Sequence, residues 1–159
     1  MESSAGELAP SVGLELSVIV PSYNEEENVP LLAEELRKEL STAGIERYEV
    51  IFVDDGSSDA TAERAREEAA RGPEGRFRLV RLAENGGESA ATEAGLRSAR
   101  GEILVVMDCD LQNPPGDIPK LLEPIRRGEA DCVCGWRADR EEGDAFWRHL
   151  QSRVANGVR

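Results

Sequence analysis

The sequence predicts an α/β fold in which a mostly parallel sheet carries helices on both faces. Apolar stretches of strand length alternate along the chain with amphipathic stretches of helix length. Glycines follow the helical stretches at positions 44, 72, 101 and 128, where they are suited to end a helix. Such strand–helix units are typical of a parallel sheet with right-handed crossovers. The third observation is the unbroken apolar run at 103–107, whose length suits a central strand buried on both faces.

The elements before that run follow in a regular order. Strands are expected at 15–20, 48–53 and 77–82, and helices are expected at 27–43, 60–71 and 88–99. The apolar positions of the first helix recur at helical spacing: Val29, Leu32, Leu36 and Leu40. Asp59 or Ser58 is placed to cap the second helix, because short polar side chains accept the free N–H groups of a helix start.

Beyond the central run, the sequence predicts a helix at 117–127, a fifth strand at 130–135 and a helix at 145–158. No linker or low-complexity segment interrupts these elements. We therefore expect a flexible N-terminal tail at 1–13 and a single domain at 14–159.

Composition excludes several classes of protein. The 159 residues are 40% hydrophobic and 4% aromatic, so a core would consist chiefly of aliphatic side chains. The net charge of −13 argues against nucleic-acid binding. No stretch reaches the roughly 18 apolar residues of a membrane span, and the start has no basic region followed by an apolar one, as a secretory signal would. We expect a cytoplasmic protein.

The three cysteines do not predict a disulfide framework. Their number is odd and no secretory signal precedes them. Cys132 and Cys134 alternate on the predicted fifth strand, and the chain has one histidine, so a zinc site would lack ligands. We expect these two cysteines to be small buried hydrophobic residues.

The central run ends on Asp108-Cys109-Asp110. Two carboxylates at positions i and i+2 of an extended backbone point to the same side, where they repel each other unless a cation lies between them. Ligation by oxygen alone suits Mg²⁺ or Mn²⁺. Most Asp-x-Asp triplets are solvated turns or helix caps, and these are the alternatives for the triplet taken alone.

Other polar residues follow the first two strands. Tyr23 and Glu25 follow the first strand, and Asp54 and Asp55 follow the second. Parallel strands bring these ends to one edge of the sheet, together with Asp108 and Asp110. A nucleotide with a metal-bound diphosphate suits such an acidic edge, because carboxylates also accept hydrogen bonds from bases and ribose. A turn followed by a helix cap is the alternative for Asp54 and Asp55.

Two further stretches are candidates for binding anions. Asn85-Gly86-Gly87 precedes a predicted helix and is compatible with a phosphate cradle or a plain turn. The end of the chain is locally basic. Its cationic residues are Arg137, Arg140, Arg148, His149, Arg153 and Arg159. They are compatible with an anion-receiving surface, since arginine suits phosphate oxygens, or with a solvated helix face.

Three stretches resemble the family 2 glycosyltransferases of the GT-A fold. They are Ser-Val-Ile-Val-Pro-Ser-Tyr-Asn-Glu-Glu-Glu-Asn-Val-Pro at 17–30, Val-Asp-Asp-Gly-Ser-Ser-Asp-Ala-Thr at 53–61 and Met-Asp-Cys-Asp-Leu-Gln-Asn-Pro-Pro at 107–115. Within that family, the stretches at 135–140 and 147–156 are most similar to the dolichyl- or undecaprenyl-phosphate sugar transferases.

The resemblance implies roles for individual residues. The nucleotide pocket would be lined by Pro21, Tyr23 and Glu25, while Val53 and Asp55 would meet the base or ribose. Asp108 and Asp110 would be the catalytic Asp-x-Asp pair and, with Gln112, would hold the metal. The backbone of Cys109 would lie against the nucleotide, and Arg137 would reach the diphosphate. Arg148 and Arg153 would face the phosphate of a lipid acceptor.

The implied activity is metal-dependent transfer of a sugar from a UDP- or GDP-sugar to a polyprenyl phosphate at the inner face of the membrane. Such enzymes continue past the equivalent of Arg159, so by this resemblance the chain looks truncated at its carboxyl end. A non-catalytic nucleotide-sugar-binding module and transfer to a hydroxyl acceptor in polysaccharide synthesis are the alternatives. Gly86 stands where the family commonly has a bulkier residue. We also expect peripheral membrane association or self-association through the helix at 145–158.

Overall fold

The computed structural model describes residues 13–73 and 75–135. The chain divides into two compact units, Met1–Lys120 and Leu121–Arg159. The first unit holds the whole described sheet and every candidate site residue that is described.

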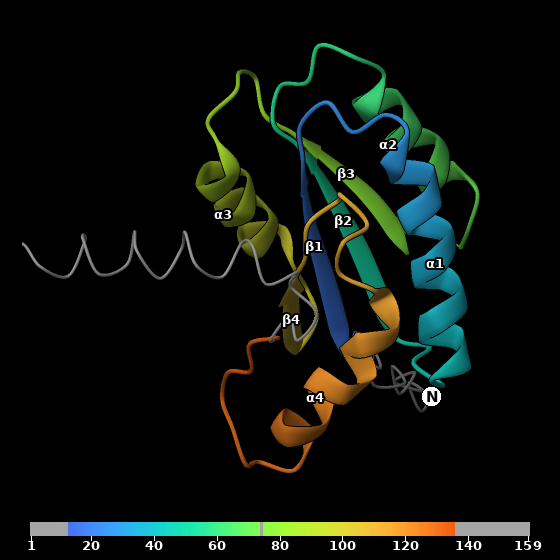
Figure 1. Cartoon of the computed structure of the whole chain (residues 1–159), viewed down its shortest axis with the longest axis vertical. Helices are drawn as coiled ribbons and strands as arrows, with labels where there is room; N and C mark the ends of the chain where they lie inside the picture. The colour runs from blue at the N-terminus through green and yellow to red at the C-terminus, as the bar shows by residue number, and fades with distance from the viewer. Residues whose placement is uncertain (1–12, 74, 136–159) are drawn as a thin grey trace, which may run out of the picture. The chain divides into compact units, whose positions relative to one another are not determined.

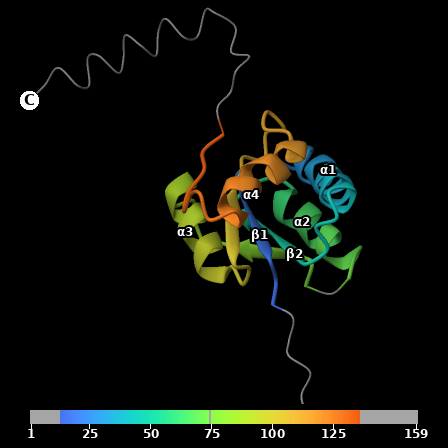
Figure 2. The same cartoon turned by 90° about the horizontal axis from the view of Figure 1, so that it is seen from below.

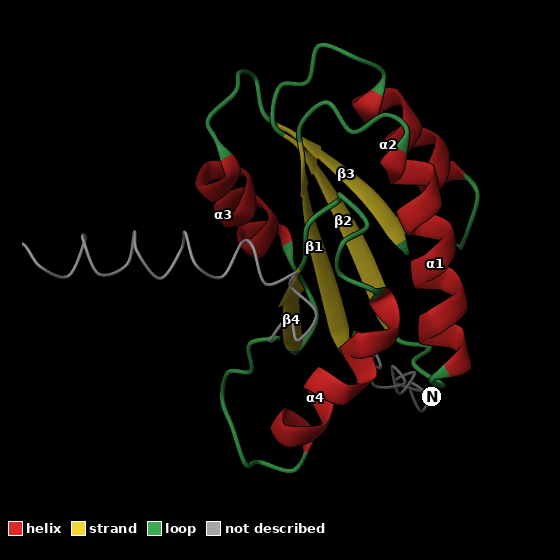
Figure 3. Ribbon diagram, in the orientation of Figure 1, coloured by secondary structure: helices red, strands yellow, loops and turns green. Residues whose placement is uncertain are grey.

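The first unit contains four parallel strands (Figure 3). They are β1 (Leu16–Ser22), β2 (Tyr48–Asp54), β3 (Phe77–Arg81) and β4 (Ile103–Val106), arranged in the order β3-β2-β1-β4. Each neighbouring pair is parallel, with Val18 opposite both Val50 and Val105. The predicted parallel α/β architecture is therefore confirmed.

Helices cover both faces of this sheet, as the sequence predicts. Helices α1 (Asn28–Thr42) and α2 (Thr61–Ala70) lie on one face, and α3 (Glu88–Ser98) lies on the other (Figures 1 and 2). The four predicted apolar positions of α1 are all buried. A short 3-10 helix, η1 (Pro115–Asp117), leads into α4 (Ile118–Arg126). No helix in the described part of the chain is long and apolar enough to cross a membrane.

Helix α3 packs closely on the sheet because residue 95 is glycine. A Cβ atom at Gly95 would lie 2.3 Å from Cγ2 of Ile19 and 3.0 Å from Cγ2 of Val53. Both side chains belong to a buried cluster with Ile51 and Ala91. The absence of a side chain at this position therefore allows the helix to approach β1 and β2.

The strand that was expected to be central is an edge strand of the described sheet. β4 pairs with β1 alone, and its exposure alternates along the strand, with Leu104 at 44% and Val106 at 48%. The prediction of burial on both faces is wrong for these two residues. Both faces of an apolar strand are buried only where neighbouring elements cover both of them. Met107 follows the strand and is buried.

The second unit, where it is described, does not contain the predicted fifth strand. Residues 130–135 form no strand, and Cys132 and Cys134 are exposed rather than buried. A strand needs a partner for its backbone hydrogen bonds, and β-alternating residues alone do not supply one. Gly128, with φ of +69°, follows the end of α4 as expected. The predicted helix at 145–158 lies outside the described residues.

A buried ionic network stabilises the amino-terminal edge of the sheet. Glu49, fully buried on β2, accepts hydrogen bonds from Ser17 Oγ at 2.7 Å, from Arg78 at 2.8 Å and from Arg100 Nη2 at 2.7 Å. Burial opposes the charge, but these donors together outweigh it and lower the pKa of Glu49 to about 2. Arg78 also donates to the carbonyl of Ser98 at 2.9 Å, so the network joins the end of α3 to the sheet.

Candidate functional site

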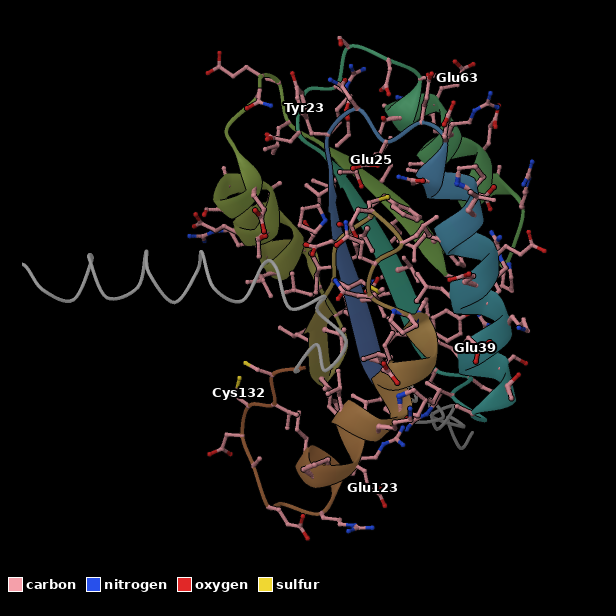
Figure 4. The ribbon with its side chains drawn as sticks, in the orientation of Figure 1. Tyr23, Glu25, Glu39, Glu63, Glu123 and Cys132 are labelled. Carbon is pink, nitrogen blue, oxygen red and sulfur yellow. The ribbon has the colours of Figure 1, made fainter. Side chains whose placement is uncertain are left out.

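The loops that follow β1 and β2 meet the start of α3 at the carboxyl edge of the sheet. They enclose an open cavity of about 270 Å³. Its lining residues are Pro21, Ser22, Tyr23, Asp55, Asn85, Gly87, Glu88 and Ala91. Figure 4 shows Tyr23 and Glu25 at this edge, on the loop between β1 and α1. Three predicted pocket residues, Pro21, Tyr23 and Asp55, are therefore brought together.

Val53 does not join them. Its side chain is fully buried in the cluster beneath α3 and is not part of the cavity lining. On a strand, successive side chains point to opposite faces, so Val53 points into the core. The backbone is the only part of Val53 that could meet a nucleotide.

Asp55 holds the wall of the cavity in place. Its Oδ1 accepts a hydrogen bond from Gly86 N at 2.7 Å, and its Oδ2 accepts one from Gly87 N at 2.8 Å. Gly87 has φ of +86°, a conformation that favours glycine, and it directly precedes α3. The carboxylate therefore fixes the loop that carries Asn85 and Glu88. Asp55 is only 3% exposed.

Asp54 has a different role from its neighbour. It is fully buried, and its Oδ1 accepts a hydrogen bond from Ser57 N at 3.1 Å. Its Oδ2 forms an ion pair with Arg81 Nε at 2.9 Å that lacks hydrogen-bond geometry. Arg81 is not among the residues predicted from the sequence, although the parallel register places it opposite Asp54. The pair compensates a buried charge beside the cavity.

The loops after β1 and β2 are joined by hydrogen bonds. Asn24 N donates to Ser57 Oγ at 2.9 Å, and Ser58 N donates to Asn24 Oδ1 at 3.0 Å. Glu25 N donates to Thr61 Oγ1 at 2.7 Å. The polar residues of the stretch at 53–61 are thus used largely to hold the neighbouring loop.

Asp59 takes part in the same connection but is not the N-cap of α2. The helix begins at Thr61, and the residue at its N-cap is Ala60, which has no capping side chain. Asp59 instead accepts hydrogen bonds from Thr61 N at 3.0 Å and Thr61 Oγ1 at 2.5 Å. Burial raises the pKa of Asp59, but the hydrogen bonds from Thr61 outweigh that effect and lower it overall. Ser58 is not the cap either, because α2 begins at Thr61 with Ala60 at its N-cap and the Ser58 hydroxyl donates to Asn24 Oδ1 at 3.3 Å.

Glu25 lies on the loop between β1 and α1, and its charge acts on Cys109, which follows β4. Its Oε2 accepts a hydrogen bond from Asn28 Nδ2 at 2.6 Å. Cys109 is 3% exposed, and burial raises the pKa of its thiol to about 12. The nearby Ser22 hydroxyl opposes this rise, whereas the charges of Glu25 and Asp110 add to it. The thiol is therefore protonated at neutral pH, and it is unsuited to act as a nucleophile.

The Asp-x-Asp stretch forms a compact turn beyond β4. Asp110 Oδ1 accepts a hydrogen bond from Gln112 N at 3.0 Å, and Asp108 Oδ2 accepts one from Asn113 Nδ2 at 3.2 Å. Leu111 between them has φ of +61°, which is unusual for a branched side chain. Asp108 is exposed and Asp110 partly exposed, while Cys109 points inward.

The chemistry of this turn fits a hard cation. Among the residues that the structure describes, no three His, Cys, Asp or Glu side chains are arranged to hold a metal ion by themselves. Mg²⁺ is commonly bound by one or two carboxylates together with substrate phosphates, so a protein-only cage is not required. Asp108, Asp110 and Gln112 offer oxygen ligands only. Arg137, Arg148 and Arg153 lie outside the described residues.

The parallel sheet, with an Asp-x-Asp turn beyond one strand, defines a domain of the GT-A class of glycosyltransferases. The chain belongs to glycosyltransferase family 2, whose pattern matches residues 17–157.

Its relatives include two enzymes that are named for polyprenyl-phosphate substrates. The chain is 42% identical, over 98% of its length, to dodecaprenyl-phosphate galacturonate synthase from Rhizobium johnstonii. It is also 42% identical, over 89% of its length, to undecaprenyl-phosphate 4-deoxy-4-formamido-L-arabinose transferase from Pectobacterium carotovorum. The matches cover 45% and 42% of those two proteins, so the chain spans less than half the length of each.

Two solved structures share the fold. One is a mannosyltransferase from Pyrobaculum calidifontis in complex with GDP-mannose and Mn²⁺. It is 34% identical, with a TM-score of 0.53 over 68% of this chain and 31% of that one. The other is glucosyl-3-phosphoglycerate synthase from Mycobacterium tuberculosis with Mn²⁺ and UDP-glucose. It is 26% identical, with a TM-score of 0.58 over 74% of this chain and 41% of that one.

Proposed function

We propose that this protein transfers a sugar from a UDP- or GDP-sugar to a polyprenyl phosphate, with Mg²⁺ or Mn²⁺ as cofactor. The observation that carries the proposal is the 42% identity to two enzymes named for polyprenyl-phosphate substrates, which extends over nearly the whole chain. The cavity beside the Asp-x-Asp turn supports it.

The chemistry of the cavity favours the nucleoside part of the donor. Among the residues that the structure describes, its lining carries two carboxylates, those of Asp55 and Glu88, and no cationic side chain. Carboxylates accept hydrogen bonds from base N–H and ribose O–H groups but repel phosphate. Tyr23 is 49% exposed and offers a ring on which a base can stack. The diphosphate would then extend away from the cavity, toward the turn at 108–112.

The metal would be held by Asp108, Asp110 and Gln112, which offer only oxygen atoms. When bound, it would supply positive charge to stabilise the leaving diphosphate. Arg137 would contact the same diphosphate, since arginine suits phosphate oxygens. Glu25 would line the nucleotide pocket between the nucleoside and the diphosphate.

The chemistry of the acceptor determines whether the protein must provide a general base. A phosphate oxygen of the acceptor would attack the anomeric carbon of the sugar, and the bond from that carbon to the diphosphate would break, releasing the nucleoside diphosphate. A phosphate monoester is already anionic at neutral pH, so its attack needs no strong general base. Arg148 and Arg153 would hold this phosphate. Because the acceptor is a lipid, the reaction would take place at a membrane surface, the inner face in a bacterium.

The proposal can be tested with radiolabelled UDP- and GDP-sugars, undecaprenyl phosphate in detergent micelles and the 159-residue chain. Labelled lipid that forms with Mn²⁺ but not with EDTA would support the proposal. Metal-dependent donor binding without labelled lipid would instead favour a nucleotide-sugar-binding module. Label in a hydroxyl acceptor, such as an oligosaccharide, but not in lipid would favour a transferase of polysaccharide synthesis. Absence of any donor binding would contradict all three.

A further inference from the structure

The backbone of Asn24, on the loop between β1 and α1, has an unusual conformation. Its φ is +56°, and Asn24 and Leu111 are the only described residues other than glycine with positive φ. Asparagine tolerates this left-handed region better than most residues, but the conformation still costs free energy. Strained residues of this kind persist where the surrounding contacts hold them, and they are concentrated at functional sites.

Hydrogen bonds from the neighbouring loop hold Asn24 in this conformation. Its N–H donates to Ser57 Oγ at 2.9 Å, and its Oδ1 accepts from Ser58 N at 3.0 Å and from Ser58 Oγ at 3.3 Å. Ser57 is buried and is itself fixed, because its N–H donates to the buried carboxylate of Asp54. The conformation of Asn24 is therefore tied to the end of β2.

The residues on either side of Asn24 make different contacts. Tyr23 lines the cavity. Glu25 is not among the residues that line it, and its Oε2 accepts a hydrogen bond from Asn28 Nδ2 at 2.6 Å. The carbonyl of Glu25 also accepts hydrogen bonds from the N–H groups of Asn28 and Val29, both at 3.0 Å, at the start of α1. A left-handed residue between Tyr23 and Glu25 reverses the chain there.

We infer that Asn24 is a positioning residue, which directs Tyr23 to the nucleoside cavity and sets the path of the chain through Glu25 into α1. The role of Asn24 in donor binding rests on the proposed function. The orientation of Tyr23 can be tested without a ligand. Asn24 itself need not touch the donor.

The chain contains only two tyrosines, which makes the orientation measurable. With 3-fluorotyrosine incorporated, ¹⁹F NMR should show one signal from Tyr23 and one from Tyr48, assigned with Tyr23→Phe. Tyr48 is 3% exposed at the start of β2, so its signal serves as the internal control. Asn24→Ala should shift or broaden the Tyr23 signal and leave the Tyr48 signal unchanged. An unchanged Tyr23 signal in folded Asn24→Ala would overturn the inference.

Nucleotide binding gives the second measurement. Calorimetry with UDP and GDP in the presence of Mn²⁺ should show affinity about tenfold weaker for Asn24→Ala. Asn24→Asp, which keeps an acceptor and tolerates positive φ, should restore most of it. Arg78→Gln, which destabilises the opposite edge of the sheet, should not weaken binding, so it separates positioning from lost stability. Equal affinity of Asn24→Ala and the unchanged chain would contradict the inference.

Two further measurements distinguish failure of this inference from failure of a variant to fold and from failure of the proposed function. If Asn24→Ala does not fold, Ser57→Ala removes the acceptor of the Asn24 N–H and should produce the same change in the Tyr23 signal; its absence would overturn the inference. If the unchanged chain binds neither nucleotide, the proposed function fails, while the ¹⁹F signals still decide whether Asn24 orients Tyr23.

Discussion

Asp55 and Gly87 are joined across the site by a 2.8 Å hydrogen bond from the glycine N–H to the aspartate Oδ2. A second hydrogen bond runs from Gly86 N to Oδ1 of the same carboxylate, so both oxygens of Asp55 bind the loop. The residue expected to meet the base or ribose therefore also shapes the wall against which the nucleoside would lie. The remaining lone pairs of its two oxygens leave capacity to accept hydrogen bonds from a ligand.

Asp55→Ala should weaken nucleotide binding by about 1–3 kcal/mol, the usual cost of losing a charged hydrogen-bond partner. Calorimetry with UDP and GDP measures this. Hydrogen exchange of the Gly86 and Gly87 amides should become faster in the same variant, because both lose their acceptor. Unchanged exchange at both glycines would show that other contacts hold the loop.

Asp59→Ala should act differently, although it lies in the same loop region. It removes an acceptor at the start of α2, so it should lower the free energy of unfolding by about 1 kcal/mol. Nucleotide affinity should change much less than for Asp55→Ala. Urea denaturation and calorimetry on both variants provide the comparison, and an exchange of the two effects would mean that the roles are reversed.

Asp110→Asn should abolish most of the metal dependence of donor binding, and most of the affinity. Its carboxylate is one of the two that would hold the cation and offset the charge of the diphosphate. Asp117→Asn is a matched control, since it removes the same charge from an exposed pair with Lys120. Donor affinity that is the same in Mn²⁺ and in EDTA for the unchanged chain would refute a metal-dependent site.

Glu49 should make stability depend on pH in the acid range. Its folded pKa of about 2 lies below the ordinary value of 4.5, so its stabilising contribution is complete above pH 4.5. That contribution is lost as the pH falls from 4.5 through about 2, since the carboxylate is then protonated. Urea denaturation at a series of pH values should show this loss, and Glu49→Gln should remove much of it.

The same substitution should lower the free energy of unfolding at neutral pH by about 1.5–3 kcal/mol, because it removes charge-assisted hydrogen bonds to Arg78 and Arg100, whose side chains are partly exposed and can be hydrated. Glu93→Gln is a suitable control, since Glu93 pairs with Arg97 at the exposed surface of α3 and should contribute less than about 1 kcal/mol. Equal effects of the two variants would show that the network contributes little.

Gly95→Ala should destabilise the fold by about 1–3 kcal/mol, as overpacking of a core does. Alanine favours a helix more than glycine, but a contact of 2.3 Å with Ile19 requires α3 or the strand to move. Ser89→Ala, at an exposed position of the same helix, should change stability by less than about 0.5 kcal/mol. Thermal denaturation of both variants checks this, and a more stable Gly95→Ala would contradict the packing.

Most of the fold can be predicted from local patterns. Apolar spacing places α1, and strand-length runs place β1 to β3, because each pattern depends on residues that are near one another in the sequence. The position of β4 at the edge of the described sheet cannot be found in this way, since the apolar run at 103–107 does not record which elements cover it. The prediction that Cys132 and Cys134 are buried on a strand is wrong for the same reason, because alternating residues do not supply a neighbouring strand.

Some features of the site can likewise be predicted from the sequence, whereas others depend on how distant segments meet. Tyr23 and Asp55 meet because parallel strands end at one edge, a rule that requires only the order of elements. The hydrogen bonds from Gly86 and Gly87 to Asp55 join residues about thirty positions apart and depend on the path of the loop. The burial of Val53 follows from side-chain alternation, which the resemblance alone did not take into account. Arg81 opposite Asp54 required the strand register.

The charge at Glu49 also bears on how the sheet selects its own pairing during folding. A slip of β2 by one residue against β1 would turn every β2 side chain to the opposite face. Val50 and Ile51 would exchange apolar surroundings at modest cost, because both faces of the sheet are covered by helices. Glu49 would leave Ser17, Arg78 and Arg100 and carry an uncompensated charge into the layer beneath α1 and α2. A misaligned sheet is thereby penalised by several kcal/mol, at a strand whose continuous apolar sequence would otherwise discriminate poorly between registers.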